Sequence, residues 1–194
     1  DASWHLPNSG RKGEEEFVFN NIKNSIFFDI DKFSNQNTSL PHMLPTKNEW
    51  ENIVSKLGIK NSDHIIVYDN SDVFSACRVW YTFIYFGHNQ NLISVLDGDF
   101  NKWLKEKKPT SRDILKISNS EYKAIEDASL VLNKHQIDEN IKNEKFQLID
   151  ARSEKRFLGI QPEPREGMRS GHIQGSKNLP FQLLINEDRT FKNV

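Results

Sequence analysis

Short apolar segments typical of strands alternate with helical segments between Thr46 and Trp103, and this alternation restricts the fold most strongly. Thr46 and Glu49 form a capping box, and apolar residues spaced i, i+3, i+4 and i+7 follow until Gly58. Three further segments come next: a strand at 64–68, a buried helix at 74–86 and a strand at 92–96. Strands that alternate with helices favour a parallel sheet, so the sequence predicts an α/β fold with helices flanking the sheet.

A second set of elements follows a polar stretch that contains Pro109. The sequence predicts a helix from about Asn133 to Ile141 and a strand from Phe146 to Asp150. We therefore expect three parts along the chain: a first domain at 1–110, an interdomain connection at 111–128 and a second domain at 129–194.

The two halves contain similar short segments, which indicate a diverged internal repeat. Asp150-Ala151-Arg152-Ser153 resembles Asp1-Ala2-Ser3-Trp4, and the segment from His172 to Phe181 resembles the segment from Asn21 to Phe28. If the repeat holds, Asp1 lies where a first strand ends. We therefore expect a chain that is cut at both ends.

Charge and cysteine content restrict the partners and the compartment. The net charge is −1, which gives no indication of nucleic acid or an anionic membrane as a partner. The longest apolar-rich run, Val79 to Phe86, is too short to cross a bilayer. The single cysteine, Cys77, forbids an internal disulfide and a multi-thiolate metal site, which favours a reducing compartment, most simply the cytoplasm.

The segment from Ile149 to Leu184 combines a strand end, a charged turn, two spaced arginines and a Gly-His-Ile-x-Gly turn. This segment resembles the start of the catalytic domain in the two-domain sulfurtransferases, the rhodanese and mercaptopyruvate sulfurtransferase family. Six more segments match the mercaptopyruvate branch in order and spacing: Asp1–Pro7, Phe27–Asp31, Leu40–Pro45, Phe74–Trp80, Phe86–His88 and Val95–Gly98. The resemblance covers nearly the whole chain.

The resemblance implies tandem rhodanese-like domains, the first inactive and the second carrying a cysteine nucleophile. In such proteins the thiolate takes a sulfur atom from the donor as a persulfide and passes it to an acceptor. The chain ends at Val194, before that cysteine is expected, so we expect the second domain to be incomplete. Because half a parallel sheet exposes unpaired backbone groups, we expect the missing C-terminal segment as a separate chain or a swapped copy.

The first domain contains a copy of the nucleophile loop, from Tyr68 to Ala76. The resemblance places Asn70 at the position of the nucleophile, so this domain is expected to be inert. Cys77 lies seven residues later among Ala76, Val79 and Trp80. We expect a packed, unreactive thiol there.

Arg156 and Arg165 match the two arginines with which family members hold the carboxylate and keto oxygen of the donor. A guanidinium can bind a carboxylate with two hydrogen bonds, which lysine cannot reproduce. The Pro162-Glu163-Pro164-Arg165 sequence favours mercaptopyruvate over thiosulfate as the donor. Without the resemblance, both arginines, like Arg152 and Arg169, are interpreted as solvated surface groups.

Asp31 and His42 match a carboxylate–imidazole pair proposed to form a proton relay with a serine of the catalytic loop. A histidine oriented by an aspartate can accept a proton near neutral pH. The alternative is that His42 only anchors the loop from Pro41 to Pro45. We expect His172 to tie a turn to the backbone.

The sequence thus predicts a sulfurtransferase that moves sulfane sulfur from 3-mercaptopyruvate through a cysteine persulfide to cyanide or a thiol acceptor such as thioredoxin. No metal or organic cofactor is expected, and this fragment alone is expected to be inactive. Two alternatives stay open: a thiosulfate sulfurtransferase, and an inactive rhodanese-like binding module.

Overall fold

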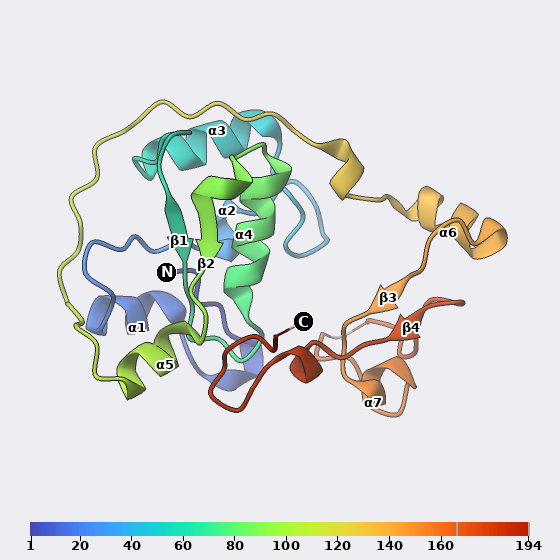
Figure 1. Ribbon diagram of the computed structural model, residues 1–194. Helices are drawn as coiled ribbons and strands as arrows, with labels where there is room; N and C mark the ends of the chain where they lie inside the picture. Colours follow the sequence, from blue (N-terminus) through green and yellow to red (C-terminus); the bar gives the residue numbers. More distant parts are fainter. Residues whose placement is uncertain (166, 194) are drawn as a thin grey trace. The chain divides into compact units, whose positions relative to one another are not determined.

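The computed structural model describes residues 1–165 and 167–193 (Figure 1). The chain divides into two compact units, Asp1–Leu130 and Val131–Val194, here called unit 1 and unit 2. Across the described residues, no helix has the length and apolar character needed to span a membrane.

Unit 1 is built around two parallel strands joined through a helix. The strands β1 (Ile65–Val67) and β2 (Ile93–Val95) pair with Ile65 opposite Ile93, and α4 (Ser75–Tyr85) connects them and packs against both (Figure 1). The remaining elements of this unit are η1 (Pro7–Ser9), α1 (Gly13–Phe19), α2 (Ile30–Phe33), α3 (Lys47–Lys56), η2 (Gln90–Leu92), α5 (Asp99–Lys105) and η3 (Ala128–Leu130). The predicted α/β fold with flanked parallel strands is confirmed.

The core of unit 1 is aromatic. Trp50 of α3 is fully buried, stacks on Phe86 with ring centroids 4.8 Å apart and meets Phe83 edge to face at 4.9 Å. Aromatic pairs of this kind contribute about 0.5–1.5 kcal/mol each beyond the area that they bury. The capping box predicted at Thr46 and Glu49 is present and starts α3 at the position that brings Trp50 into the core.

Residues 106–127 pass around unit 1 without regular helix or strand (Figure 1). Tyr122 and Ala124 from this segment are 1% and 2% exposed and belong to the hydrophobic core. The backbone amide of Tyr122 donates a hydrogen bond to the hydroxyl of Ser55 in α3, and the backbone amide of Ala124 donates one to the carboxylate of Glu51. The segment predicted as an interdomain connection is therefore attached to unit 1 through the buried Tyr122 and Ala124, while most of its other residues are exposed.

Unit 2 contains a second pair of parallel strands, β3 (Ile149–Asp150) and β4 (Lys177–Asn178). Its other elements are α6 (Lys134–Asn143), α7 (Glu154–Phe157) and η4 (Phe181–Leu184). Among the described residues of this unit, no apolar side chain is buried. Ile149 is 54% exposed and Ile160 72% exposed, so residues 131–165 and 167–193 form no hydrophobic core of their own.

Candidate functional site

Asp31 and His42 lie in contact in unit 1. Asp31 belongs to the short helix α2, which starts where the Asp29 side chain accepts the Lys32 amide at 3.0 Å. His42 lies in the following loop with a φ of 56°. Its Nε2 is 2.6 Å from Oδ1 of Asp31. The α2 cap and the left-handed turn at His42 together bring the two side chains to one place.

Trp4 and Arg78 hold this pair from two sides. The indole Nε1 of Trp4 donates to the other carboxylate oxygen of Asp31 at 2.9 Å, and its ring meets the His42 ring edge to face at 4.9 Å. Arg78 of α4 donates to the His42 carbonyl oxygen at 2.5 Å. The backbone and the ring of His42 are therefore both fixed.

This geometry defines which imidazole nitrogen can act as a base. When Nε2 carries the proton and donates it to Asp31, the lone pair is on Nδ1. An oriented imidazole of this kind can accept a proton from a reacting group. The same contacts also anchor the loop from Pro41 to Pro45.

The loop before α4 is organised by the buried carboxylate of Asp69, which is 1% exposed. Its Oδ2 accepts the Ser75 hydroxyl at 3.0 Å and the Ala76 amide at 2.7 Å. An acidic side chain that accepts the first amides of a helix also matches the positive end of the helix dipole. Asp69 therefore fixes the start of α4 and the shape of the loop that contains Asn70.

The side chain of Asn70 binds the ion pair formed by Arg11 and Glu16. Its amide Nδ2 donates to Glu16 at 2.8 Å, and Arg11 donates to the same carboxylate at 2.7 and 2.8 Å. Arg11 also reaches the Asn70 carbonyl oxygen at 3.4 Å. The hydrogen bond from Arg11 lowers the pKa of Glu16 below its ordinary value of 4.5. Glu16 is therefore a fixed negative charge beside this loop.

Cys77 lies on α4 and is partly buried. Burial raises the pKa of its thiol from 9.0 to about 11, and the nearby charge of Asp69 acts in the same direction. A thiol in this state is a poor nucleophile at neutral pH.

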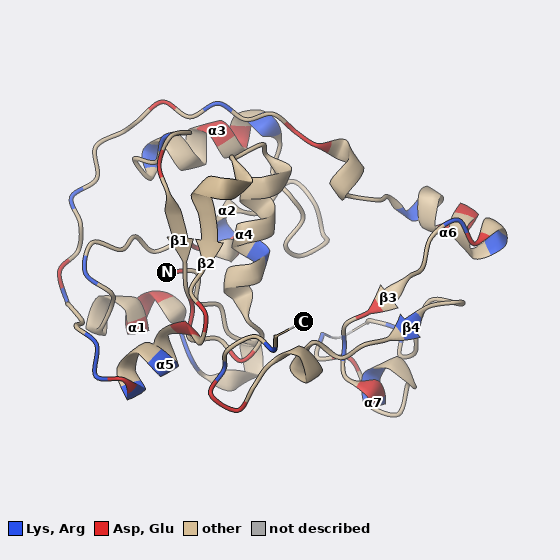
Figure 2. Cartoon of the chain, viewed as in Figure 1, with Lys and Arg blue, Asp and Glu red and all other residues tan. Residues whose placement is uncertain are grey.

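In unit 2, Arg156 lies on α7, where basic and acidic residues are adjacent (Figure 2). Its Nε donates to Oε1 of Glu163 at 3.3 Å, and its Nη2 donates to Oε2 of the same carboxylate. The side chain of Glu163 is only 5% exposed, against 28% for Arg156. Glu163 therefore occupies the Nε–Nη2 edge of the guanidinium.

Arg152, interpreted from sequence as a solvated surface group, is also part of this network. It donates to Glu163 at 2.7 Å, to Asp150 at 2.5 Å and to the Gly171 carbonyl oxygen at 2.7 Å. Its hydrogen bonds lower the pKa of the Asp150 carboxyl. The pKa of Glu163 is lowered as well, and the hydrogen bond from Arg156 is the largest cause. Sequence reasoning missed both Arg152 and Glu163, although the placement of Glu163 between two prolines was a usable signal.

Arg165 is exposed on the same loop, two residues after Glu163. His172 ties that part of unit 2 together, since its Nδ1 donates to the Phe157 carbonyl oxygen at 2.8 Å and the two rings stack at 3.8 Å. This is the structural role that the sequence predicts for His172.

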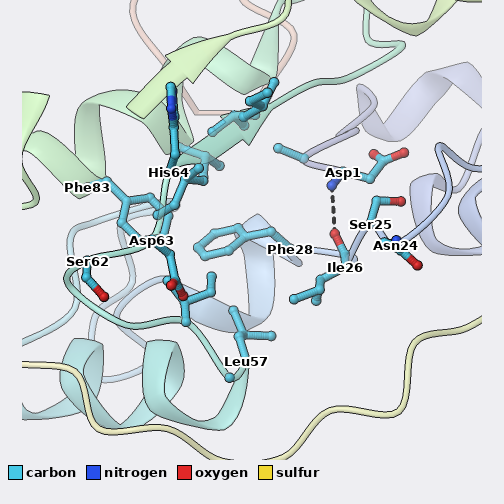
Figure 3. A pocket seen from close by; sticks show the side chains of 17 residues that line it. Asp1, Asn24, Ser25, Ile26, Phe28, Leu57, Ser62, Asp63, His64 and Phe83 are labelled. Carbon is cyan, nitrogen blue, oxygen red and sulfur yellow. Dashed lines mark hydrogen bonds between the residues drawn. The ribbon is translucent and has the colours of Figure 1, made fainter. Parts of the chain in front are cut away.

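A cavity of about 560 Å³ lies beside β1 in unit 1 (Figure 3). Its walls include Ile65, Val67 and Phe28, and beside it the Asp1 amino group donates to the Ile26 carbonyl oxygen at 2.6 Å. None of the described residues that line it is Asp31, His42, Arg156 or Arg165. Within the described part of the chain, no three His, Cys, Asp or Glu side chains form a metal-binding group.

The comparisons with known proteins agree on one family. Residues 11–106 match the rhodanese-like domain. The chain is 41% identical to the 3-mercaptopyruvate sulfurtransferase of Mus musculus over 190 residues, covering 96% of this chain and 63% of the relative. It is 39% identical to the thiosulfate sulfurtransferase of Bos taurus over 191 residues, covering 97% of this chain and 63% of the relative. The chain thus spans less than two thirds of these relatives.

Two solved structures have the same fold. The Tum1 protein from Saccharomyces cerevisiae aligns with a TM-score of 0.88 at 33% identity, covering 98% of this chain and 66% of that one. The 3-mercaptopyruvate sulfurtransferase SseA from Escherichia coli aligns with a TM-score of 0.88 at 28% identity, covering 100% of this chain and 71% of that one.

Proposed function

Because the chain belongs to the family of the rhodanese and 3-mercaptopyruvate sulfurtransferases, we propose that the whole protein transfers sulfane sulfur from 3-mercaptopyruvate to cyanide or a thiol acceptor. The observation that carries the proposal is the identity to a 3-mercaptopyruvate sulfurtransferase along nearly the whole chain. A small thiol protein of the thioredoxin type is the acceptor that we propose.

We propose that Arg156 and Arg165 bind the donor. 3-Mercaptopyruvate carries a carboxylate and a keto oxygen, and both accept hydrogen bonds from guanidinium groups. The two arginines belong to one short segment that Pro162 and Pro164 restrict. Asp31 and His42 are proposed to act as a proton relay, with Nδ1 of His42 as the accepting nitrogen.

The reaction has two sulfur transfers. A cysteine thiolate attacks the donor sulfur, the carbon–sulfur bond breaks, and the leaving enolate takes up a proton to become pyruvate. The acceptor thiolate or cyanide then attacks the outer sulfur of the persulfide and regenerates the cysteine thiolate. Because Cys77 is half-buried with a raised pKa, we place the nucleophile outside residues 1–194.

We also propose that units 1 and 2 are related rhodanese-like repeats. In both units the backbone amide and the hydroxyl of a serine both donate to the carbonyl oxygen three residues earlier. These pairs are Ser25 with Ile22 and Ser176 with Ile173, and the hydroxyl distance is 2.6 Å in each. The preceding residue has a positive φ in both turns, 66° at Asn24 and 79° at Gly175. These matching turns support the internal repeat.

Unit 2 is proposed to be covered by a further segment, as a separate chain or a swapped copy. Its exposed apolar residues support this, because side chains such as Ile149 and Ile160 stabilise a fold only when water is excluded from them. We propose a cytoplasmic location on the basis of the single, unpaired cysteine.

The test uses the full-length protein with 3-mercaptopyruvate and, separately, thiosulfate. We expect pyruvate release and a persulfide, seen by intact mass, with 3-mercaptopyruvate as the better donor. A persulfide formed faster from thiosulfate would favour the rhodanese alternative, which the bovine relative supports. If neither donor forms a persulfide, the inactive binding module replaces the proposal.

A further inference from the structure

Glu163 of the Pro162–Arg165 loop binds Arg152 and, on α7, Arg156. The Glu163 carboxylate accepts Nη1 of Arg152 at 2.7 Å through Oε1 and Nη2 of Arg156 through Oε2. The Glu163 side chain is 5% exposed and each arginine 28% exposed, so the two ion pairs are partly shielded from water. Charge-assisted hydrogen bonds in such surroundings hold their partners in a defined orientation.

Arg152 supports this arrangement from the other side. Its guanidinium also donates to both oxygens of Asp150 on β3 and to the Gly171 carbonyl oxygen. The chain of contacts from Asp150 through Arg152 and Glu163 to Arg156 therefore connects the strand end, the loop and α7. Two arginines and two carboxylates give this network a formal charge of zero.

A neutral network has a consequence for an anionic donor. The Nε–Nη2 edge of Arg156 is occupied by Glu163, which leaves the remaining N–H groups of the guanidinium, those on Nη1 foremost, to meet a ligand. The network itself adds no net charge to the site, so it contributes to recognition through the direction of these N–H groups. Glu163 sets that direction and also fixes the loop that carries Arg165.

We propose that Glu163 is a positioning residue for donor binding, which orients the Arg156 guanidinium and the Arg165 loop toward a carboxylate ligand. This inference rests on the proposed function of the two arginines. It adds that donor binding requires a defined orientation of these arginines as well as their positive charge.

Replacing Glu163 with glutamine separates orientation from charge, because the two effects have opposite signs. Glu163→Gln adds one net positive charge beside the donor, so charge alone predicts tighter binding and a lower KM. Loss of orientation predicts a KM for 3-mercaptopyruvate that is higher by about tenfold, the equivalent of one charge-assisted hydrogen bond. We expect the higher KM, with kcat within about twofold.

Two variants of the full-length protein serve as controls. Glu154→Gln removes the same charge from an exposed position on α7 and is expected to leave KM within about twofold. Glu163→Asp keeps the charge and is expected to recover part of the binding. It also keeps the test decisive if Glu163→Gln does not fold.

A second readout does not depend on activity. In protein labelled with ¹⁵N-arginine, the Nε–H signal of Arg156, assigned with Arg156→Lys, is expected to be protected from exchange and to lose this protection in Glu163→Gln. An unchanged signal, or a KM that is unchanged or lower, would overturn the positioning role. If Glu163→Gln loses the Arg156 protection as expected but the wild-type protein takes no sulfur from 3-mercaptopyruvate, the proposed function is refuted and the positioning of Arg156 is not.

Discussion

Cys77 provides the sharpest test of whether unit 1 is chemically inert, because it is the single cysteine of the sequence. Burial raises the pKa of its thiol from 9.0 to about 11. At pH 7.5 a thiol with a pKa of about 11 is about 0.03% ionised, against about 3% for a pKa of 9.0. Since the thiolate is the reacting species, we expect alkylation of the folded protein about 100-fold slower than that of an exposed thiol.

The assay follows iodoacetamide labelling of Cys77 by mass spectrometry, on a peptide that contains this residue. The same protein unfolded in guanidinium chloride gives the reference rate, so differences in the reagent cancel. Between pH 7 and 9.5 the rate for the folded protein is expected to rise about tenfold per pH unit without levelling, whereas the unfolded reference levels near pH 9.

Asp69→Asn separates the two causes of the raised pKa. Burial is the larger cause and the charge of Asp69 the smaller one, so labelling of this variant is expected to stay slow. Equal rates for the folded and unfolded wild-type protein would refute the reasoning. Cys77 would then have to be considered as a carrier of sulfur.

Three further perturbations test stability and binding. Asp69→Ala removes two hydrogen bonds from the start of α4 and is expected to destabilise the protein by about 3 kcal/mol in urea unfolding, with a smaller loss for Asp69→Asn, which keeps an acceptor. Arg165→Lys keeps the charge but not the planar donor, so the KM for 3-mercaptopyruvate should rise by about tenfold or more while the melting temperature stays within about 2 °C of wild type. The folded-state pKa values of Glu16 and His5 are both lowered, the first mainly by Arg11 and the second mainly by burial. The stability that depends on these two groups is therefore complete above pH 6.5. Below pH 6.5 the part that depends on His5 is lost, and below pH 4.5 the part that depends on Glu16. Glu16→Gln should remove the loss below pH 4.5 in thermal unfolding.

The elements that the sequence predicts are those with a strong local pattern. The capping box and the apolar spacing after it identified α3, and the apolar run at 74–86 identified α4. The sequence did not reveal α1, because its apolar residues Phe17, Val18 and Phe19 are adjacent and show no helical period. The four-residue helices α2 and α7 are too short to contain a period.

Long-range contacts explain the remaining differences. Tyr122 and Ala124 lie in a polar stretch without periodicity, so nothing local indicates that they fill the core of unit 1. The pairing of Glu163 with Arg152 and Arg156 joins residues 11 and 7 positions apart, outside the spacing of one helical turn. The resemblance identified Asp31 and His42, but the support from Trp4 requires the folded chain, since Trp4 and Asp31 are 27 positions apart.

The contacts of Asn70 in unit 1 bear on the sequence prediction that this unit is inert. In unit 1, Arg11 holds Glu16 against the loop before α4, and the Asn70 amide donates to that carboxylate. A thiolate at the position of Asn70 would stand beside a negative charge, which disfavours its ionised form. An amide at the same place is instead stabilised by the carboxylate. The loop of unit 1 is therefore arranged to bind its own Glu16, and its contacts favour a neutral donor over an anionic nucleophile.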